Sequence, residues 1–241
     1  MVLQVSGVTF ITGEVQVFTG LTFSVAAGEA LAIAGVGGSG KTALTHLLLG
    51  LLPSTAGTIR LWDQDVAASS YYNLLRLRQR VGYLPQHPNL VGNLRLWENV
   101  ALPLLYHRRA ARADALAAAG RLLDWAGVGP WADRLPDEVP MAVQKRACLA
   151  RAAALEPEFL LLDDPLDGLD PAGSAQMERA VRELAAGRTL LCTTASLPAA
   201  MRLAERVAVL AGGTIRLDGP AAAIAQSSDP AVRSLLAEVP G

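Results

Sequence analysis

The feature that most constrains the fold of this sequence is the run GVGGSGKT at residues 35–42. It follows the apolar run ALAIA (30–34), which reads as a strand, and it leads into TALTHLLLGLL, whose apolar residues have helical spacing. The run matches the phosphate-loop pattern G-x-x-x-x-G-K-[ST] in the strand, loop and helix context that the pattern requires. Both flanking elements disfavour the alternative, an ordinary glycine-rich turn with a solvated lysine.

Each residue type in this run suits the binding of phosphate. Glycine lets the backbone wrap closely around a phosphate so that several N–H groups point inward, and the start of the following helix adds a partial positive charge. The ammonium of Lys41 can reach the terminal phosphates, and the hydroxyl of Thr42 can bind Mg2+. The predicted nucleotide-binding residues of this run are Gly35, Gly38, Ser39, Gly40, Lys41 and Thr42.

A second apolar run, FLLLD at residues 159–163, ends in a carboxylate. A phosphate loop is commonly paired with such a strand, whose terminal aspartate holds the magnesium ion. A strand that ends in aspartate is common by chance, so the assignment depends on its pairing with the loop. Asp163 is therefore predicted to bind the metal together with Thr42.

Strand-like and helix-like runs alternate along the chain. Residues 2–35 contain short β-like runs, GTIRLWDQDV (57–66) reads as another strand, and the periodicity between about 90 and 150 is helical. Further on, FLLLDD and RTLLCTTA read as strands, and RVAVLAGGTIRLDG reads as a pair of strands joined at Gly212-Gly213. Between the first two, PAGSAQMERAVRELAAG reads as a helix that ends at Gly187. This alternation predicts an α/β protein with a mainly parallel sheet flanked by helices.

The composition excludes several other classes of protein. The chain has 241 residues, of which 51% are hydrophobic and 18% charged, so it can form a sizeable core. Its 21 basic and 22 acidic residues give a net charge of -1, which disfavours nucleic acid as a partner. Polar residues, glycine and proline interrupt the apolar runs, and the N-terminus lacks the pattern of a secretory signal, so no membrane span or signal is expected. Cys148 and Cys192 are expected to be reduced, buried thiols.

The order and spacing of these motifs resemble the nucleotide-binding subunits of ATP-binding cassette (ABC) transporters over essentially the whole chain. Besides the loop at 35–42, the family's glutamine loop matches Tyr83-Leu84-Pro85-Gln86, and its helix after the signature matches KRACLARA (145–152). Its second acidic motif matches LLLDDP (160–165), and the loop behind that motif matches LDGLD (166–170).

The resemblance implies a fold and a domain organisation. The expected fold is an α/β P-loop NTPase core with a parallel sheet, an N-terminal antiparallel β-rich part and an inserted α-helical subdomain. Residues 1–241 would form a single nucleotide-binding domain. Its core would comprise 1–89 and about 151–241, and the helical insertion would occupy about 90–150.

The resemblance also implies cofactors and partners. The bound cofactors would be ATP and Mg2+, and Gln86 would sense both the magnesium ion and the γ-phosphate. The chain would work with membrane-spanning transporter subunits and a second cassette subunit, either identical or different. It would be cytoplasmic and peripheral, on the cytoplasmic face of the inner or plasma membrane.

The helical insertion carries a weaker indication of cargo and docking. The stretch WENVALPL (97–104) is similar to the subgroup that serves lipid or lipoprotein export and outer-membrane lipid trafficking, although related importers share parts of it. In the family, this region forms much of the groove for a cytoplasmic helix of the transporter. Exposed aromatic side chains at Trp97, Tyr106 and Trp125 are compatible with such a groove, and core packing within amphipathic helices is the alternative.

The sequence departs from the family at the positions used for hydrolysis. The signature leucine-serine-glycine-glycine aligns with Val139-Pro140-Met141-Ala142, where none of the four letters matches. The general-base glutamate is replaced by Asp164, which is therefore the candidate catalytic residue. Its shorter side chain reduces its reach toward an attacking water. The switch histidine aligns with Ala195, and no histidine follows His107 in the sequence.

Two smaller departures concern the nucleotide itself. Ala43 replaces a usual hydroxyl that contacts phosphate, and Thr12 stands where an aromatic residue usually stacks on adenine. Phe10 lies nearby in the sequence as a candidate substitute for that aromatic residue.

These observations leave two main hypotheses. The chain is either an energising ATPase subunit of a transporter, or a regulatory or structural ATP-binding partner that does not hydrolyse. A soluble cassette ATPase of DNA repair or translation is a third reading, disfavoured because the chain has neither tandem cassettes nor a coiled-coil insertion. Nucleotide binding is expected under the first two, whereas hydrolysis is left open.

Overall fold

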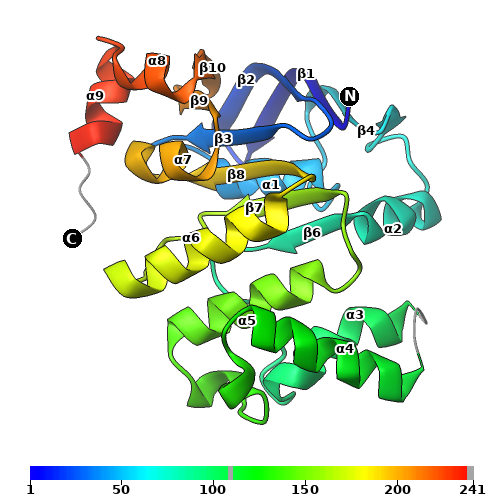
Figure 1. Ribbon diagram of the computed structural model, residues 1–241. Helices are drawn as coiled ribbons and strands as arrows, with labels where there is room; N and C mark the ends of the chain where they lie inside the picture. The colour runs from blue at the N-terminus through cyan, green and yellow to red at the C-terminus, as the bar shows by residue number, and fades with distance from the viewer. Residues whose placement is uncertain (108–110, 238–241) are drawn as a thin grey trace.

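The computed structural model describes residues 1–107 and 111–237, which form two β-sheets with helices around them (Figure 1). The strands are β1 (Leu3–Thr12), β2 (Val15–Val25), β3 (Ala30–Ala34), β4 (Ala56–Leu61), β5 (Gln64–Asp65), β6 (Val81–Leu84), β7 (Phe159–Asp163), β8 (Thr189–Thr194), β9 (Arg206–Ala211) and β10 (Thr214–Pro220). The larger sheet has the order β10-β9-β3-β8-β7-β6, and only β10 in it runs antiparallel to its neighbour within the described residues. The smaller sheet is antiparallel, with the order β2-β1-β4-β5.

The helices cover both faces of the larger sheet. They are α1 (Lys41–Leu48), α2 (Tyr71–Gln79), α3 (Leu96–Tyr106), α4 (Arg112–Trp125), α5 (Met141–Ala153), α6 (Pro171–Ala185), α7 (Leu197–Leu203), α8 (Ala221–Ala225) and α9 (Pro230–Ala237). Two 3-10 turns, η1 (Gly129–Trp131) and η2 (Pro136–Glu138), lie between α4 and α5. In the described part of the chain, no helix combines the length and the apolar character that crossing a bilayer would need.

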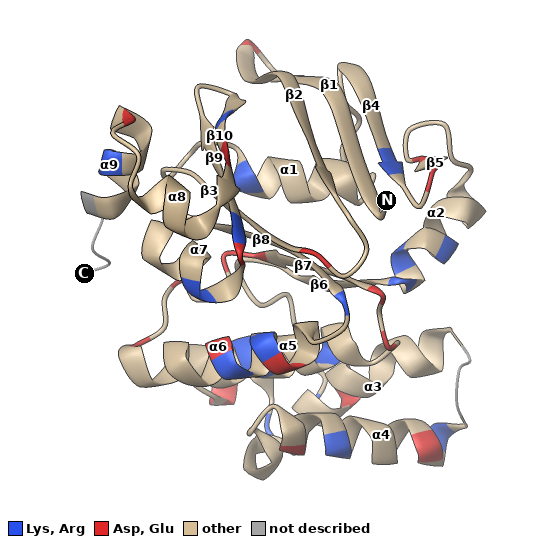
Figure 2. Ribbon diagram, turned by 45° about the horizontal axis from the view of Figure 1, so that its top comes forward, with Lys and Arg blue, Asp and Glu red and all other residues tan. Residues whose placement is uncertain are grey.

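The central strands have apolar side chains on both faces because the sheet is covered on both sides. Alternate residues of a strand point to opposite faces, so Leu161 and Leu191 pack with α1 and the antiparallel sheet, whereas Leu160 and Leu190 pack with α5, α6 and α7. Figure 2 shows the consequence, since the central strands are mostly tan and the charged segments lie largely on the helices. The predicted α/β class with its parallel sheet and antiparallel N-terminal part is confirmed.

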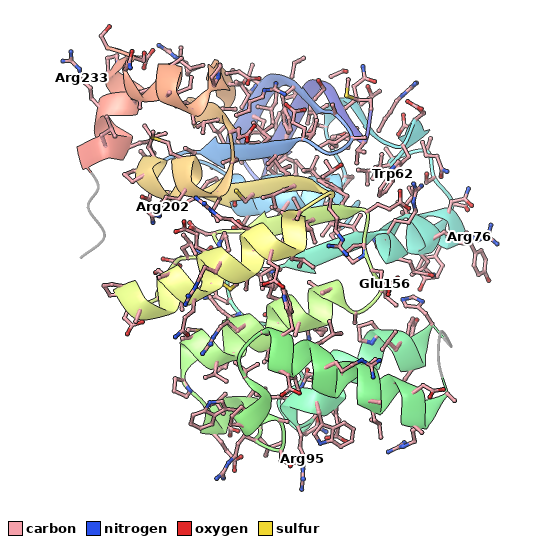
Figure 3. All side chains as sticks on the ribbon, in the orientation of Figure 1. Trp62, Arg76, Arg95, Glu156, Arg202 and Arg233 are labelled. Atoms are coloured by element: carbon pink, nitrogen blue, oxygen red, sulfur yellow. The ribbon has the colours of Figure 1, made fainter. Side chains whose placement is uncertain are left out.

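The helices α3, α4 and α5 lie together on one side of the larger sheet (Figure 1) and share their own apolar cluster. The side chain of Asn99 is buried in this region and bonds to the backbone of the preceding loop, accepting from the Val91 N–H at 2.7 Å and donating to the Leu94 carbonyl at 3.0 Å. Figure 3 shows Arg95, the residue before α3, at the outer margin of this region.

The aromatic residues Trp97, Tyr106 and Trp125 of this helical region differ in exposure, so docking and core packing apply to different residues. Tyr106 is 68% exposed, as a docking role requires. Trp97 and Trp125 are only partly exposed and pack against the apolar cluster of α3, α4 and α5. Core packing therefore accounts for these two residues, and the expectation of exposed rings there is wrong.

One predicted strand is interrupted. The run at 57–66 forms β4 and the short β5, which are joined by a turn at Trp62 and Asp63 with φ of 46° and 65°. Two consecutive residues with positive φ suit the tight turn of an antiparallel hairpin. The ring of Trp62, labelled in Figure 3, is held at this turn by the Arg80 guanidinium 3.8 Å from its centroid. At the hairpin that the sequence does predict, Gly212 and Gly213 also have positive φ and join β9 to β10.

Candidate nucleotide-binding site

The loop at residues 35–42 joins β3 to α1 at the carboxyl edge of the parallel strands. Gly38 has φ of 76°, and Gly40, the residue that caps the start of α1, has φ of 95°. A Cβ atom on Gly40 would lie 2.5 Å from Val17 Cγ1 and 2.9 Å from Phe18 Cζ. Both the backbone conformation and the lack of space therefore require glycine here, and the loop has the tight geometry that the motif predicts.

The ammonium of Lys41 lies against this loop. The side chain is 9% exposed, and Nζ donates to the carbonyls of Gly35 at 2.7 Å and Val36 at 3.1 Å. A lysine on the first turn of α1 is thus folded back over the loop and places its positive charge at the start of the helix. This position is consistent with a role in holding phosphate.

Two buried polar atoms at the site have no hydrogen-bond partner among residues 1–107 and 111–237. They are Ser39 Oγ on the loop and Asp163 Oδ2 at the end of β7. A buried polar atom without a partner is costly, and such atoms in a site indicate a group that completes them. A hydroxyl and a carboxylate oxygen suit a phosphate and a hard metal ion, respectively.

Asp163 is held rigidly at the metal side of the site. It is 1% exposed, and its Oδ1 accepts a hydrogen bond of 2.5 Å from Thr193 Oγ1 on the neighbouring strand β8. Among the described residues, no group of three or more His, Cys, Asp or Glu could hold a metal by itself. This is compatible with Mg2+, which is usually held by one or two carboxylates together with the phosphates of its nucleotide.

The structure brings Thr42 and Gln86 together. Thr42 Oγ1 lies 3.5 Å from Gln86 Oε1, at the outer limit of a hydrogen bond. Gln86 follows β6, which pairs with β7, so Gln86 and Asp163 emerge at the same edge of the sheet. Thr42, Gln86 and Asp163, which lie far apart in the sequence, therefore lie around one end of the parallel strands.

Asp164 has an unusual backbone and a buried side chain. Its φ is 44°, and its Oδ2 accepts from the backbone N–H of Ala195 at 3.2 Å. Burial is the largest cause that raises the pKa of this carboxyl above its ordinary value of 3.8, the charge of Asp167 adds to it, and the charge of Lys41 opposes it. The carboxylate is thus directed toward the backbone of Ala195, the position aligned with the family's histidine.

The segment Val139-Pro140-Met141-Ala142 leads into α5. Pro140 caps this helix, which begins at Met141, so the proline lies just before the first turn rather than within it. Val139 is buried, and Met141 is 43% exposed. The helix therefore forms as expected, but every residue at its start carries a side chain and Pro140 offers no N–H.

The structure does not support Phe10 as a platform for adenine. Phe10 is 7% exposed and lies in the core beside Phe18, with ring centroids 6.4 Å apart. Its position at alternate spacing on β1 with Val8, also buried, is the physical reason. Thr12, at the end of the same strand, is exposed.

Lys145 and Asp167 also belong to this site, and neither was singled out from the sequence. Lys145 on α5 is 2% exposed, and its Nζ donates to the carbonyls of Asp164 at 3.1 Å and Asp167 at 2.6 Å. Burial lowers the pKa of its ammonium, while the nearby carboxylates of Asp167, Asp164 and Asp163 oppose that shift. The available signal was its spacing, because Lys145 lies three and four residues before the apolar Cys148 and Leu149, on the buried face of the helix.

The fold and the site define an α/β nucleotide-binding protein with a phosphate loop, and the comparisons give its family. The family model described as ABC transporter matches residues 18–167. The chain therefore belongs to the ABC transporter family.

Relatives in this family carry several cargo names. The molybdenum import ATP-binding protein ModC of Mycobacterium tuberculosis (strain ATCC 25618 / H37Rv) is 39% identical over 206 residues, which cover 83% of this chain and 56% of the relative. The Nod factor export ATP-binding protein I of Burkholderia orbicola (strain AU 1054) is 36% identical over 216 residues, or 89% of this chain and 69% of the relative. The chain thus spans little more than half the length of the ModC relative.

Solved structures agree with the fold. MJ0796, a bacterial ABC transporter cassette solved as a dimer, superposes with a TM-score of 0.85 at 25% sequence identity, covering 91% of this chain and 98% of that one. A second match, cbiO1 of Clostridium perfringens, has a TM-score of 0.81 at 22% identity over 92% of this chain and 90% of that one, and supports the fold alone.

Proposed function

We propose that this chain is an ATP-binding subunit of an ABC membrane transporter that binds Mg-ATP at the loop of residues 35–42. Lys41 and the start of α1 hold the phosphates, and Thr42, Gln86 and Asp163 hold the magnesium ion. When bound, Mg2+ neutralises part of the phosphate charge. The observation that carries the proposal is the loop itself, with Lys41 folded over it. Beside the loop lie Ser39 Oγ and Asp163 Oδ2, two buried atoms without a hydrogen-bond partner in the part of the chain that the structure describes.

The working assembly is part of the same proposal. The chain acts as one cassette domain, with the core at 1–89 and about 151–241 and the helical insertion at about 90–150, whose separate apolar cluster supports this division. It works on the cytoplasmic face of the membrane, in a dimer with a second cassette and docked to membrane-spanning subunits. Cassette relatives that carry transport names and a cassette solved as a dimer support this assembly.

The cargo is a separate part of the proposal. The lipid prediction depends on residues 97–104, whereas the relatives are named for molybdenum import, for Nod factor export and, as a probable function, for ribonucleotide transport. None of these names adds support for lipid. Lipid transport therefore stays a prediction that depends on one short stretch of α3.

Calorimetry with Lys41→Ala tests the binding proposal. We expect ATP to bind the unmodified chain in the presence of Mg2+, and the variant to bind about 10- to 100-fold more weakly, because a hydrogen bond to a charged group contributes about 1.5–3 kcal/mol. Arg76→Ala is the matched control, since it removes an exposed cation from α2 (Figure 3). This helix leads into the start of β6, whereas the site lies at the end of that strand. Equal affinities for the unmodified chain and Lys41→Ala would refute the proposal.

A second candidate, a non-hydrolysing regulatory or structural partner of a competent cassette, is favoured by one observation. The carboxylate at the base position, Asp164, is buried and accepts a hydrogen bond from the backbone N–H of Ala195. A positioned general base contributes roughly 10²- to 10⁴-fold to a rate. Asp164 is shorter than glutamate and already accepts a hydrogen bond from the Ala195 backbone, so this contribution should be reduced. In a mixed dimer, turnover would then come from the site that takes its base and histidine from the partner.

A further inference from the structure

We propose that Asp167, whose backbone is held by the buried ammonium of Lys145, is a positioning residue that fixes the orientation of the Gln86 amide at the metal site. The inference deepens the proposed function and depends on it, since Gln86 has a metal to face only if the site binds Mg-ATP. It assigns a role to a residue of the loop at 166–170 and to a lysine of α5.

The orientation follows from the chemistry of the two side chains. Gln86 Nε2 lies 3.1 Å from Asp167 Oδ2, and an ionised carboxylate can only accept hydrogen bonds. The amide must therefore present its NH2 group to Asp167 and its oxygen to the other side, where Thr42 Oγ1 lies at 3.5 Å. Mg2+ prefers oxygen ligands, so this orientation is the one in which Gln86 can serve the metal.

Asp167 can orient the amide because its own backbone is fixed. Its carbonyl accepts a hydrogen bond of 2.6 Å from Lys145 Nζ, and its N–H donates to the carbonyl of Asp164 at 3.2 Å. The same ammonium bonds the Asp164 carbonyl at 3.1 Å, which ties together both ends of the turn. The exposed side chain of Asp167 is thus attached to a backbone anchored in the core.

The use of lysine in this chain supports a specific role for Lys145. The sequence contains two lysines, Lys41 and Lys145, and both are largely buried at this site, whereas arginine supplies the other 19 cationic side chains. A compact ammonium with three donors can bond two neighbouring carbonyls in a confined space, which the larger planar guanidinium of arginine fits poorly. Orienting groups behind metal ligands typically change metal affinity by about 10- to 100-fold when they are removed.

The test measures how much Mg2+ strengthens ATP binding. ATP affinity is determined by calorimetry in EDTA and in saturating Mg2+, and the ratio of the two affinities is the metal coupling. We expect Asp167→Asn to lower this ratio by about tenfold while leaving the affinity in EDTA within about twofold, because asparagine can present either an oxygen or an NH2 group to Gln86. The control Asp114→Asn removes an equal charge from the exposed first turn of α4 and should leave the ratio unchanged.

A double-mutant cycle separates positioning from direct effects of the charge. If Asp167 acts through Gln86, Asp167→Asn should change the ratio by less than about twofold in a Gln86→Ala background. An equal loss in both backgrounds would overturn the proposal, since Asp167 would then act on the metal independently of Gln86. A ratio unchanged by Asp167→Asn would overturn it too.

Lys145→Leu completes the test. It removes the ammonium but keeps an apolar side chain, and it should lower the metal coupling, as Asp167→Asn does. Lys145→Gln keeps a hydrogen-bond donor and should lower the coupling less than Lys145→Leu. Unfolding curves identify a variant that has simply lost its fold. Normal coupling in a folded Lys145→Leu would remove Lys145 from the proposal. An unmodified chain that binds no Mg-ATP would refute the proposed function as well, whereas normal coupling in Asp167→Asn alone would refute only this inference.

Discussion

The starts of α1 and α5 are two helix ends of one chain that differ in almost every feature that phosphate binding requires. The α1 end has a glycine cap with φ of 95°, a lysine folded over it and no room for a Cβ atom at Gly40. The α5 end has Pro140 as its cap, followed by Met141 and Ala142. Backbone and phosphate can approach closely at the first end, whereas Cβ atoms and a missing N–H stand in the way at the second.

This difference shows that a helix start alone does not make a phosphate site. Both helices carry the same partial positive charge at their first turn, so the macrodipole does not distinguish them. What differs is the side-chain content of the three or four residues around the cap. In this account, the α1 end serves the chain's own nucleotide, and the α5 end, which in the family faces the partner's nucleotide, has lost the groups that would contact it.

Among single substitutions at the two helix starts, Gly40→Ala should lower the stability of the protein most. A side chain at φ of 95° costs about 1–3 kcal/mol, and the contact at 2.5 Å with Val17 Cγ1 adds to it. We expect a loss of stability of at least that size in urea unfolding, together with weaker ATP binding. Gly37→Ala in the same loop is the control, because a Cβ there would meet nothing within 4 Å, and it should change stability by no more than about 1 kcal/mol. Equal effects of the two variants would contradict the account of the loop.

A smaller effect is expected from Asp164→Asn. Burial, helped by the charge of Asp167, raises the pKa of Asp164, so the folded state holds this proton more tightly than the unfolded state does. The stability that Asp164 contributes is then fully present below its ordinary pKa of 3.8 and is lost as pH rises through the raised value. Asparagine cannot ionise and tolerates positive φ, so Asp164→Asn should be more stable than the unmodified chain at pH 7.

The pH dependence gives the sign of this effect. Urea unfolding at a series of pH values should show the advantage of Asp164→Asn shrinking as the solution is made more acidic. An advantage that grows toward acid pH would mean that the pKa of Asp164 is lowered in the folded state. Asp114→Asn, at an exposed position on α4, provides the baseline for the loss of one carboxylate.

The smallest effect on nucleotide binding is expected at the start of α5. Replacing Pro140-Met141-Ala142 with Ser-Gly-Gly restores the family's letters at the start of α5, but in this account the segment does not contact the chain's own nucleotide. The affinity of the isolated, monomeric chain for Mg-ATP should therefore stay within about twofold by calorimetry. A change as large as that expected for Lys41→Ala would mean that both helix ends act on the same nucleotide.

The parts of the site that are local in sequence could be predicted, and the parts that depend on long-range contacts could not. The loop at 35–42 and Asp163 have local patterns because a strand, a turn and a helix start follow one another along the chain. Gln86 and Asp167 are 81 residues apart, and no local pattern indicates that their side chains meet. The burial of Lys145 could have been inferred from its spacing on α5, but its two carbonyl partners could not.

The same distinction between local patterns and long-range contacts holds for the fold. The apolar runs of β3, β7 and β8 identified the central sheet, and Gly212-Gly213 identified a hairpin. The sequence indicates β6 only as part of the glutamine loop, because VGYL is short and gains its strand conformation by pairing with β7. The sequence does not predict the turn at Trp62, because a tryptophan with positive φ is unusual and the contact with Arg80 that holds its ring comes from a later segment.

ATP turnover by the purified chain, measured on a sample whose Mg-ATP binding has been established by calorimetry, tests the central claim most directly. The claim is that binding and hydrolysis are separated in this chain. We expect saturable binding with turnover well below about 1 s⁻¹, the lower end of ordinary enzyme rates, and a higher rate in the double replacement Asp164→Glu, Ala195→His. Turnover of about 1 s⁻¹ or more by the unmodified chain would contradict the claim and identify it as an energising ATPase.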